Sequence, residues 1–531
     1  MRHRSGCLLS SLLLSSLTWA AVPDSPGKAC TALKQLTLPH ASITLAQMVA
    51  AGKFVPPDQK KDEKVPPLYT SAPPFCRVLA TLKPTADSDI KVEVWMPIKG
   101  WNGRFRAVGN GGFAGYIGYR GLASAVTQGY ASASTDTGHS TTDADWALGH
   151  PEKLIDYGYR AVHEMTLDAK AIIKAYYAED PKRSYFASCS NGGRQALMEA
   201  QRFPDDYDGI LAGAPANNWV PMVTAGLRTI QTLDAAGYIP PAKIPAISQA
   251  VLNACDAADG VKDGVLNDPR QCHFDPAKLQ CKDTESDSCL TSPQINSLRM
   301  IYAGARDPYG KPIYPGLLPG AEEGDGGWKL WITGEEEGKS LVTFFVTGYF
   351  TNMVYGQKDW DFKKANIGTA LRLAQSKTAG VLNATDAHLQ AFIRHGGKLI
   401  LYHGWNDPAI SALNSIEYFN RAQAETGAGM DQSVRLYMVP GLQHCGGGPG
   451  ATAFGQDDVA PRGDAGHDVF RALVEWVEDG KAPNSIIATK YREAGPAGTV
   501  QLTRPLCPYP QAAKYDGKGD PNAAESFACT K

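Results

Sequence analysis

A serine, an aspartate and a histidine in distant parts of the chain could together catalyse acyl transfer. Ser190 stands in the segment SCSNGG, residues 188–193, between a short apolar run and a helix-forming run. A strand, a tight turn that carries a serine, and a helix form a nucleophile elbow, which needs small residues at the turn. Gly192 is such a residue, whereas Ser188 stands where the general pattern has glycine. The segment predicts Ser190 as a nucleophile, with a helix N-cap serine as the alternative.

A serine hydroxyl is a poor nucleophile until a base takes its proton. Two of the eleven histidines, His403 and His444, follow patterns typical of buried strands, at residues 398–402 and 434–439. Chains with a nucleophile elbow place the acid after the serine and the histidine last. This order predicts Asp407 as the acid and His444 as the base, and it leaves His403 as a structural or pocket residue.

Cysteines flank two of the predicted partners. Cys189 directly precedes Ser190, and Cys445 directly follows His444. If the serine and the histidine touch, the two sulfurs are close enough to bridge. A disulfide here would tie the elbow to the histidine loop, whereas chance adjacency is the alternative.

The negative charge that develops during acyl transfer needs two N–H donors. One is the amide of Asn191, which follows the nucleophile. The glycine-rich loop 109–112 follows an early strand pattern and predicts the second donor near Gly112. An ordinary turn is the alternative for this loop.

An acidic loop, CDAADGVKDGV at residues 255–265, is a separate signal. Calcium prefers hard oxygen ligands in a flexible arrangement. The spacing differs from that of an EF-hand, and a solvated Asp-Gly turn is the alternative. The loop predicts a structural calcium site whose ligands are the carboxylates of Asp256, Asp259 and Asp263 and the carbonyls of Val261 and Val265.

The elements around these residues alternate between strand and helix patterns. Apolar residues at helical spacing cover 152–177, and the helix-forming run 191–203 lies between strand patterns at 184–187 and 208–213. Such alternation predicts an α/β fold with a mainly parallel sheet covered on both faces. From about residue 217 to residue 360 the alternation is lost, which predicts an inserted second domain.

Composition and charge indicate a soluble globular protein. The 531 residues are 43% hydrophobic and 20% charged, as in soluble globular proteins. A formal net charge of −2 gives no sign of a nucleic-acid or membrane-surface partner. Residues 1–21 have a basic start, an apolar stretch and small residues at their end, which predicts a signal peptide and a secreted or periplasmic protein. The ten cysteines beyond it suit disulfides.

The chain resembles the tannase and feruloyl esterase family over nearly its whole mature length. The matching segments are WNGRF (101–105), STDTGH (134–139), SYFASCSNGGRQALMEAQRFPDDYDGILAGAPANNW (184–219), CDAADGVKDGVLNDP (255–269), LYHGWNDP (401–408), GLQHCGGGPG (441–450) and RPLCPYP (504–510).

The resemblance implies an α/β-hydrolase fold with a large inserted lid. The hydrolase domain would comprise residues 22–216 and 361–531, and the lid with its calcium site residues 217–360. The family triad matches Ser190, Asp407 and His444, and the family calcium ligands match the five residues of the acidic loop. The implied disulfides are Cys189–Cys445, Cys30–Cys76, Cys255–Cys272, Cys281–Cys289 and Cys507–Cys529.

The resemblance also implies substrates: small esters of aromatic acids, or feruloylated or galloylated polymers. One branch of the family hydrolyses mono(2-hydroxyethyl) terephthalate and holds its carboxylate with a lid arginine. Lys329 stands at that place here and lacks the bidentate fork, so phenolic-acid esters rank first. Trp328, Trp331 and Phe345 are predicted to stack on the acyl group, or else to pack in the lid. A secreted carbohydrate-binding protein and a hydrolase with metal-activated water are the rivals.

Overall fold

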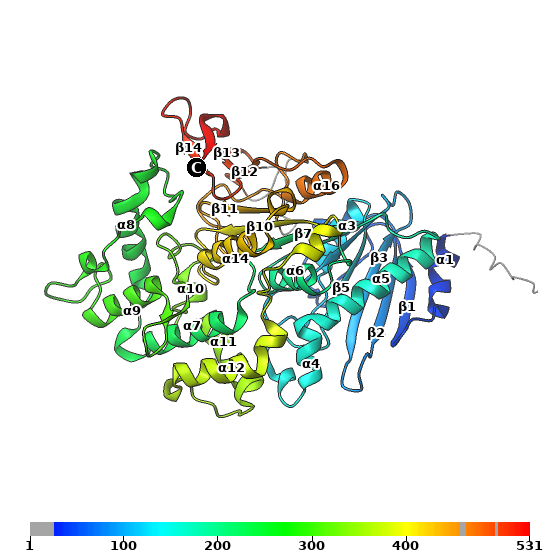
Figure 1. Cartoon of the computed structure of the whole chain (residues 1–531), viewed down its shortest axis with the longest axis horizontal. Helices are drawn as coiled ribbons and strands as arrows, with labels where there is room; N and C mark the ends of the chain where they lie inside the picture. The colour runs from blue at the N-terminus through cyan, green and yellow to red at the C-terminus, as the bar shows by residue number, and fades with distance from the viewer. Residues whose placement is uncertain (1–25, 457–462, 494–497) are drawn as a thin grey trace, which may run out of the picture.

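The computed structural model of the chain describes residues 26–456, 463–493 and 498–531 (Figure 1). The predicted signal peptide, residues 1–21, lies outside the described residues.

A nine-stranded sheet forms the centre of the molecule, in the order β1-β2-β3-β5-β4-β6-β7-β10-β11. In this order, the neighbours β1-β2, β2-β3 and β3-β5 pair antiparallel. Every later pair, from β5-β4 to β10-β11, is parallel. The predicted parallel sheet is therefore present, with an antiparallel extension at one edge. The strands are β1 (Ala41–Val49), β2 (Phe75–Leu82), β3 (Ile90–Pro97), β4 (Arg104–Val108), β5 (Ala131–Thr135), β6 (Arg183–Cys189), β7 (Gly209–Gly213), β10 (Lys398–Gly404) and β11 (Val434–Val439).

Helices cover both faces of the parallel strands. Because side chains alternate along a strand, Leu399 and Leu401 of β10 enter one apolar cluster and Ile400 enters the other. The first cluster includes residues of α5 and α6, and the second includes residues of α16. The helices outside the insert are α1 (Pro26–Ala32), α2 (Pro67–Thr70), α3 (Tyr119–Thr127), α4 (Pro151–Ile155), α5 (Ala161–Tyr177), α6 (Asn191–Arg202), α14 (Ala412–Thr426), α15 (Met430–Ser433) and α16 (Val469–Asp479).

Between β7 and β10 the chain forms an inserted, mainly helical segment, which Figure 1 shows gathered on the side of the sheet away from β1. Helix α12 packs against α7, so this layer continues past residue 360, where the predicted lid ends; the domain boundaries stay predictions. The elements are α7 (Trp219–Thr232), α8 (Ile244–Cys255), α9 (Ser292–Ala303), β8 (Ala305–Arg306), β9 (Pro312–Tyr314), α10 (Trp328–Trp331), α11 (Leu341–Gly348), α12 (Ile367–Leu382) and α13 (Gln390–Arg394).

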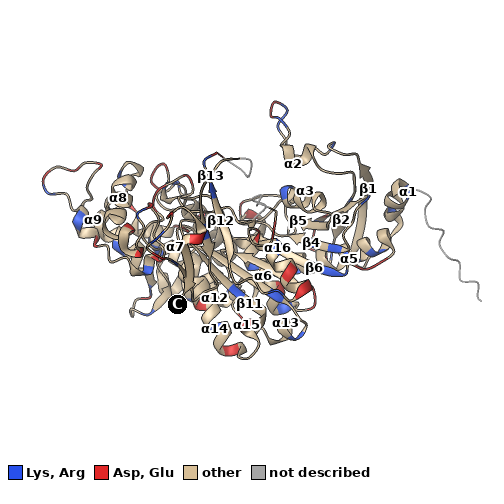
Figure 2. Cartoon of the chain, turned by 90° about the horizontal axis from the view of Figure 1, so that it is seen from above, with Lys and Arg blue, Asp and Glu red and all other residues tan. Residues whose placement is uncertain are grey.

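The C-terminal part adds two antiparallel ribbons, β12 (Ile486–Tyr491) with β13 (Val500–Leu506) and β14 (Ala512–Tyr515) with β15 (Phe527–Thr530). Acidic and basic residues are interspersed along the chain (Figure 2). In the described ranges, no helix is both long and apolar enough to cross a bilayer. Five disulfides join the implied pairs: Cys30–Cys76, Cys189–Cys445, Cys255–Cys272, Cys281–Cys289 and Cys507–Cys529.

Candidate active site

Ser190 occupies the sharp turn between β6 and α6. Its φ of 65° and ψ of −125° place a non-glycine residue in a strained conformation of the kind found at functional sites. The turn has no room for larger neighbours: a Cβ on Gly192 would lie 1.9 Å from the Ser188 hydroxyl oxygen, and one on Gly193 2.3 Å from the Gly213 carbonyl oxygen. The elbow predicted from the sequence is present, and its two glycines are sterically required.

His444 lies between Ser190 and Asp407. Its Nε2 is 2.9 Å from the Ser190 Oγ, and its Nδ1 is 2.8 Å from the Asp407 Oδ2. This geometry suits a tautomer in which Nδ1–H donates to the carboxylate and Nε2 accepts the serine proton. The structure thus brings together the three side chains that the sequence predicts to meet.

Asp407 is held as a buried carboxylate. Its Oδ1 accepts hydrogen bonds from the backbone amides of Ala409 at 2.8 Å and Ile410 at 2.9 Å. Burial alone raises the pKa of this carboxyl, but the charges and hydrogen bonds of His444 and His403 outweigh it and leave the pKa below its usual range. Asp407 therefore stays negative and can stabilise a positive charge on His444.

His403 lies behind Asp407 as a structural residue, which is the role that chain order predicts for it. The ring is fully buried, with Nδ1 2.7 Å from the Ser415 hydroxyl and Nε2 3.0 Å from the Ile410 carbonyl oxygen. Its Nε2 is also 3.3 Å from Asp407 Oδ2. These contacts fix the loop that carries Asp407. The histidine that is hydrogen bonded to Ser190 is His444.

A disulfide fastens the elbow to the histidine loop. Cys189 is the last residue of β6, and Cys445, whose φ is 62°, directly follows His444. The bond joins residues 256 positions apart in the chain. It limits how far the serine and the imidazole can separate.

Gly112 and Asn191 line the same pocket as Ser190 and His444. Asn191 is the first residue of α6, and the first amides of a helix have no partner within it. Gly112 has a φ of 57°, which glycine adopts readily. The residues of both predicted N–H donors therefore line the pocket that Ser190 lines.

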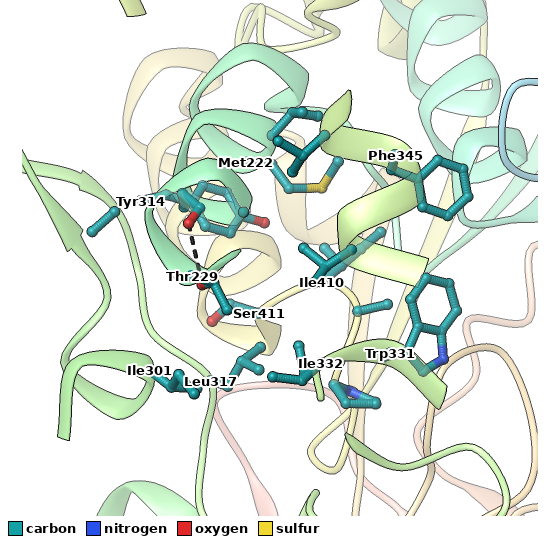
Figure 3. Close-up of a pocket in the computed structure, with 18 of the residues that line it drawn as sticks. Met222, Thr229, Ile301, Tyr314, Leu317, Trp331, Ile332, Phe345, Ile410 and Ser411 are labelled. Carbon is teal, nitrogen blue, oxygen red and sulfur yellow. Dashed lines mark hydrogen bonds between the residues drawn. The ribbon is translucent and has the colours of Figure 1, made fainter. Parts of the chain in front are cut away.

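The pocket has an empty volume of about 1040 Å³, open solvent at its mouth included. Side chains from α7, α9, α10, α11 and the 408–411 loop line it. Most of those drawn in Figure 3 are apolar, such as Met222, Leu317 and Ile410. Trp331 meets the His444 ring edge-on at 4.8 Å, and its ring is nearly parallel to that of Phe345 at 6.2 Å. The space next to the serine suits a flat apolar group.

Trp328 and Lys329, predicted to contact substrate, lie away from this pocket. Trp328 is fully buried in the core of the insert, where its ring centre is 5.8 Å from that of Tyr302. Lys329 is half-exposed and pairs with Glu335 at 2.8 Å. Trp328 and Lys329 thus make other contacts, while Trp331, at the end of the same short helix, reaches the pocket. Of the residues predicted to contact the acyl group, Trp331 and Phe345 line the pocket.

The acidic loop has the oxygen-rich chemistry expected of a calcium site. Asp259, Val261, Asp263 and Val265 line one small cavity, and Asp256 Oδ1 accepts the Gly264 amide at 3.0 Å. Burial, and then the negative charges of Asp263 and Asp256, raise the pKa of Asp259, although backbone hydrogen bonds oppose the shift. A bound cation would relieve this repulsion.

The loop is not a closed cage of carboxylates. Asp263 turns its Oδ2 to Arg504, at 2.7 Å. Within the described part of the chain, the three aspartates do not form a group whose ligand oxygens all lie within 4.8 Å of one another. The donor set fits a hard cation, and the carbonyls of Val261 and Val265 would complete it.

The residues that support and extend the site carry weak signals in the sequence and were not predicted. Tyr157 and Arg194 contact the segments that carry Gly112 and Asn191, and Tyr314 lines the far part of the pocket. Arg194 directly follows the two glycines of the elbow, and this position was the one feature of the sequence that could have marked it. Tyr314 sits in a segment without periodicity, where no signal marked it.

Comparisons with known proteins agree with this architecture. The family described as tannase and feruloyl esterase matches residues 76–530. An uncharacterised esterase of Xanthomonas campestris is 41% identical, over 95% of this chain and 92% of that protein. A protein of Aspergillus clavatus named probable feruloyl esterase B is 32% identical, over 98% of this chain and 99% of its own length.

Solved structures show the same fold. An Aspergillus oryzae esterase superposes with a TM-score of 0.88 at 28% identity, covering 95% of this chain and all of the other. Feruloyl esterase B of the same fungus gives 0.87 at 26% identity, with the same coverage. The fold is therefore that of an α/β-hydrolase with a large insert. The chain belongs to the tannase and feruloyl esterase family and is a carboxylic-ester hydrolase of that type.

Proposed function

We propose that this protein is an exported serine esterase that cleaves esters of phenolic acids through an acyl-enzyme. The observation that carries the proposal is His444, hydrogen bonded to Ser190 at 2.9 Å and to Asp407 at 2.8 Å. A nucleophile, a base and an orienting acid in this order perform acyl transfer on unrelated folds. The five disulfides suit an oxidising compartment and support export.

In the proposed mechanism, Ser190 attacks the ester carbonyl while His444 Nε2 takes its proton. The amides of Asn191 and Gly112 stabilise the negative oxygen of the tetrahedral intermediate. The alcohol leaves with the proton from His444, and the acyl group stays on Ser190. Water then gives a proton to His444 and attacks the acyl carbon. The bond from that carbon to the Ser190 oxygen breaks, the serine takes its proton back from His444, and the acid leaves. Asp407 stabilises the imidazolium in both steps.

The pocket favours an aromatic acyl group. Its walls are mainly apolar, with Trp331 and Phe345 beside His444, and relatives of this chain are named feruloyl esterase B. Ferulate esters are therefore the first candidates and galloyl esters the second. Terephthalate monoesters rank lower, because Lys329 lies outside the pocket and pairs with Glu335.

Steady-state kinetics test the proposal on methyl ferulate, methyl caffeate, methyl gallate and mono(2-hydroxyethyl) terephthalate. We expect the highest kcat/KM among the ferulate and caffeate esters. Labelling by a fluorophosphonate probe at one site per chain is expected in the same sample. A protein that binds carbohydrate without catalysis would neither turn over any ester nor take the label.

Tyr314 supplies a polar group to the pocket. The residue is 94% buried, its hydroxyl has no hydrogen-bond partner in the described residues, and Figure 3 shows it directed between Met222 and Ile410. Ser411 and Thr229 nearby donate their own protons to backbone carbonyls, which leaves their oxygens free to accept. A phenol hydroxyl, which both accepts and donates, fits this set.

We expect Tyr314→Phe to lower kcat/KM for methyl ferulate about three- to tenfold, the worth of one hydrogen bond. Methyl cinnamate, which lacks the phenol, should be hydrolysed at the wild-type rate. Tyr309→Phe, at a tyrosine that is 94% exposed, is the control and should change neither substrate. Equal losses on both esters would show that Tyr314 does not contact the phenol.

Calcium is proposed as a structural ion of the acidic loop, and no step of the reaction involves it. Removal with a chelator should lower the melting temperature by about 5 °C, because a ligand bound only to the folded state stabilises it. Initial rates at 25 °C should not change while the protein remains folded. Asp259→Asn should melt lower than wild type and lose its response to the chelator. Immediate loss of turnover in a folded, calcium-free sample would contradict a purely structural ion.

A further inference from the structure

Arg194 is a fully buried arginine three residues after Asn191 on α6. In the part of the chain that the structure describes, its guanidinium makes no ion pair with a carboxylate. Burial lowers the pKa of its guanidinium, and the neighbour that counteracts this is Tyr157 rather than an acid. An arginine stays protonated under such conditions, so a positive charge lies uncompensated beneath the elbow.

Neutral groups hold this cation in place. The Nη1 donates to the Gly158 carbonyl at 2.7 Å, and Nη2 donates to the Tyr157 carbonyl at 3.1 Å. The guanidinium carbon is 4.9 Å from the ring centre of Tyr157 and 5.6 Å from that of Trp219. Hydrogen bonds and aromatic faces thus stabilise the charge without cancelling it.

The same cation supports the Asn191 side of the oxyanion site. Arg194 Nε donates to Asn191 Oδ1 at 2.8 Å, and Asn191 Nδ2 donates to the Asn110 carbonyl at 3.0 Å. The Asn191 side chain therefore connects the start of α6 to the glycine-rich loop. This fixes the orientation of the residue whose amide is the first proposed donor.

Tyr157 supports the Gly112 side. Its hydroxyl is 2.9 Å from the Gly112 carbonyl oxygen and 3.1 Å from Asn191 Oδ1. The hydroxyl has one proton and donates it to either oxygen in turn. Because Arg194 contacts Tyr157 through both the ring and the backbone, one residue braces both proposed donors.

Burying an unpaired charge is costly for stability, and hydrophobic residues often replace buried ions without loss. In the proposed mechanism a negative charge develops at the oxygen held by the Asn191 amide, three residues before Arg194 on α6, when the tetrahedral intermediate forms. The start of α6, with its partial positive charge, points the same way. The missing carboxylate is thus consistent with an anion that the reaction itself supplies.

We propose that Arg194 is a positioning residue of the oxyanion site: it braces Asn191 and Tyr157 and provides an uncompensated positive charge for the intermediate. The inference rests on the proposed serine-esterase function. It adds to that function a source of intermediate stabilisation that does not touch the substrate.

The test is Arg194→Met, which keeps much of the side-chain volume and removes the charge and the donors. We expect kcat for methyl ferulate to fall about 10- to 100-fold with KM nearly unchanged, less than the loss of a direct donor. Affinity for an aryl trifluoromethyl ketone, which forms a tetrahedral adduct with the serine, should fall by the same factor. Affinity for ferulic acid as a competitive inhibitor should not change. Arg194→Lys should recover part of kcat.

Arg106→Met is the matched control, because Arg106 is also a buried arginine over an aromatic ring, 4.3 Å from the centre of Phe470. It should lower the melting temperature and leave kcat unchanged. If Arg194→Met does not fold, Tyr157→Phe decides, with an expected three- to tenfold loss of kcat and of ketone affinity. Wild-type kcat in a folded Arg194→Met protein, or in Tyr157→Phe when that variant decides, overturns the inference. An inactive wild type would instead refute the proposed function.

Discussion

Ser190→Ala is expected to lower kcat for methyl ferulate by about 10⁵- to 10⁶-fold and to leave the melting temperature nearly unchanged. The hydroxyl accounts for one hydrogen bond, to His444 at 2.9 Å, so its loss costs the fold little. The backbone strain at a φ of 65° is the same for alanine. Among the residues that the structure describes, however, no other hydroxyl is hydrogen bonded to that imidazole.

Activity and stability must be measured on the same preparation. Ser184→Ala removes another buried hydroxyl from the same strand, β6, and should keep wild-type turnover. The fluorophosphonate label should disappear from the Ser190 variant alone. Turnover within about tenfold of wild type in Ser190→Ala would refute the nucleophile assignment.

Asp407→Asn should lower kcat by about 10⁴-fold. The Asp407 Oδ1 accepts amide protons from Ala409 and Ile410, so the asparagine oxygen must stay at that place. The new NH₂ group then faces His444 Nδ1 and donates to it. The imidazole is forced to carry its proton on Nε2, where it can no longer accept the serine proton.

The same substitution should change stability with pH. The pKa of Asp407 lies below its usual range in the folded state. Its contribution to stability is therefore complete above about pH 4 and is lost as the pH falls further, and Asp407→Asn should abolish this part of the acid sensitivity. Asp386→Asn, at an exposed pair with His388 at 3.1 Å, is the control. Near-normal kcat in Asp407→Asn would show that the carboxylate does not set the tautomer.

The triad could be predicted because each member lies at the end of a strand with a clear local pattern. The strand before His444 has the bounds that its apolar run indicates, Val434–Val439, and Ser190 falls between a strand and a helix as predicted. The carboxyl ends of neighbouring parallel strands meet at one edge of a sheet. Chain order and strand ends were therefore sufficient to bring these residues together.

The pocket could not be predicted in the same way. Met222, Tyr314 and Phe345 come from three elements of the insert, whose packing has no short repeat. Within α10, composition alone cannot tell which aromatic side chain faces the cavity: Trp331 lines it, whereas Trp328 packs in the insert, the alternative given for it. Arg194 was missed for a related reason, since its environment is made by residues distant in the chain.

The bond between Cys189 and Cys445 has a consequence for biosynthesis. The ribosome must add 256 residues after the first of these cysteines before the second exists. Nascent and prematurely terminated chains therefore carry the hydroxyl without its base and are inert. Where thiols are kept reduced, even the finished polypeptide lacks this covalent tie. The covalent tie between the elbow and the histidine loop is therefore complete only in a finished chain and under oxidising conditions.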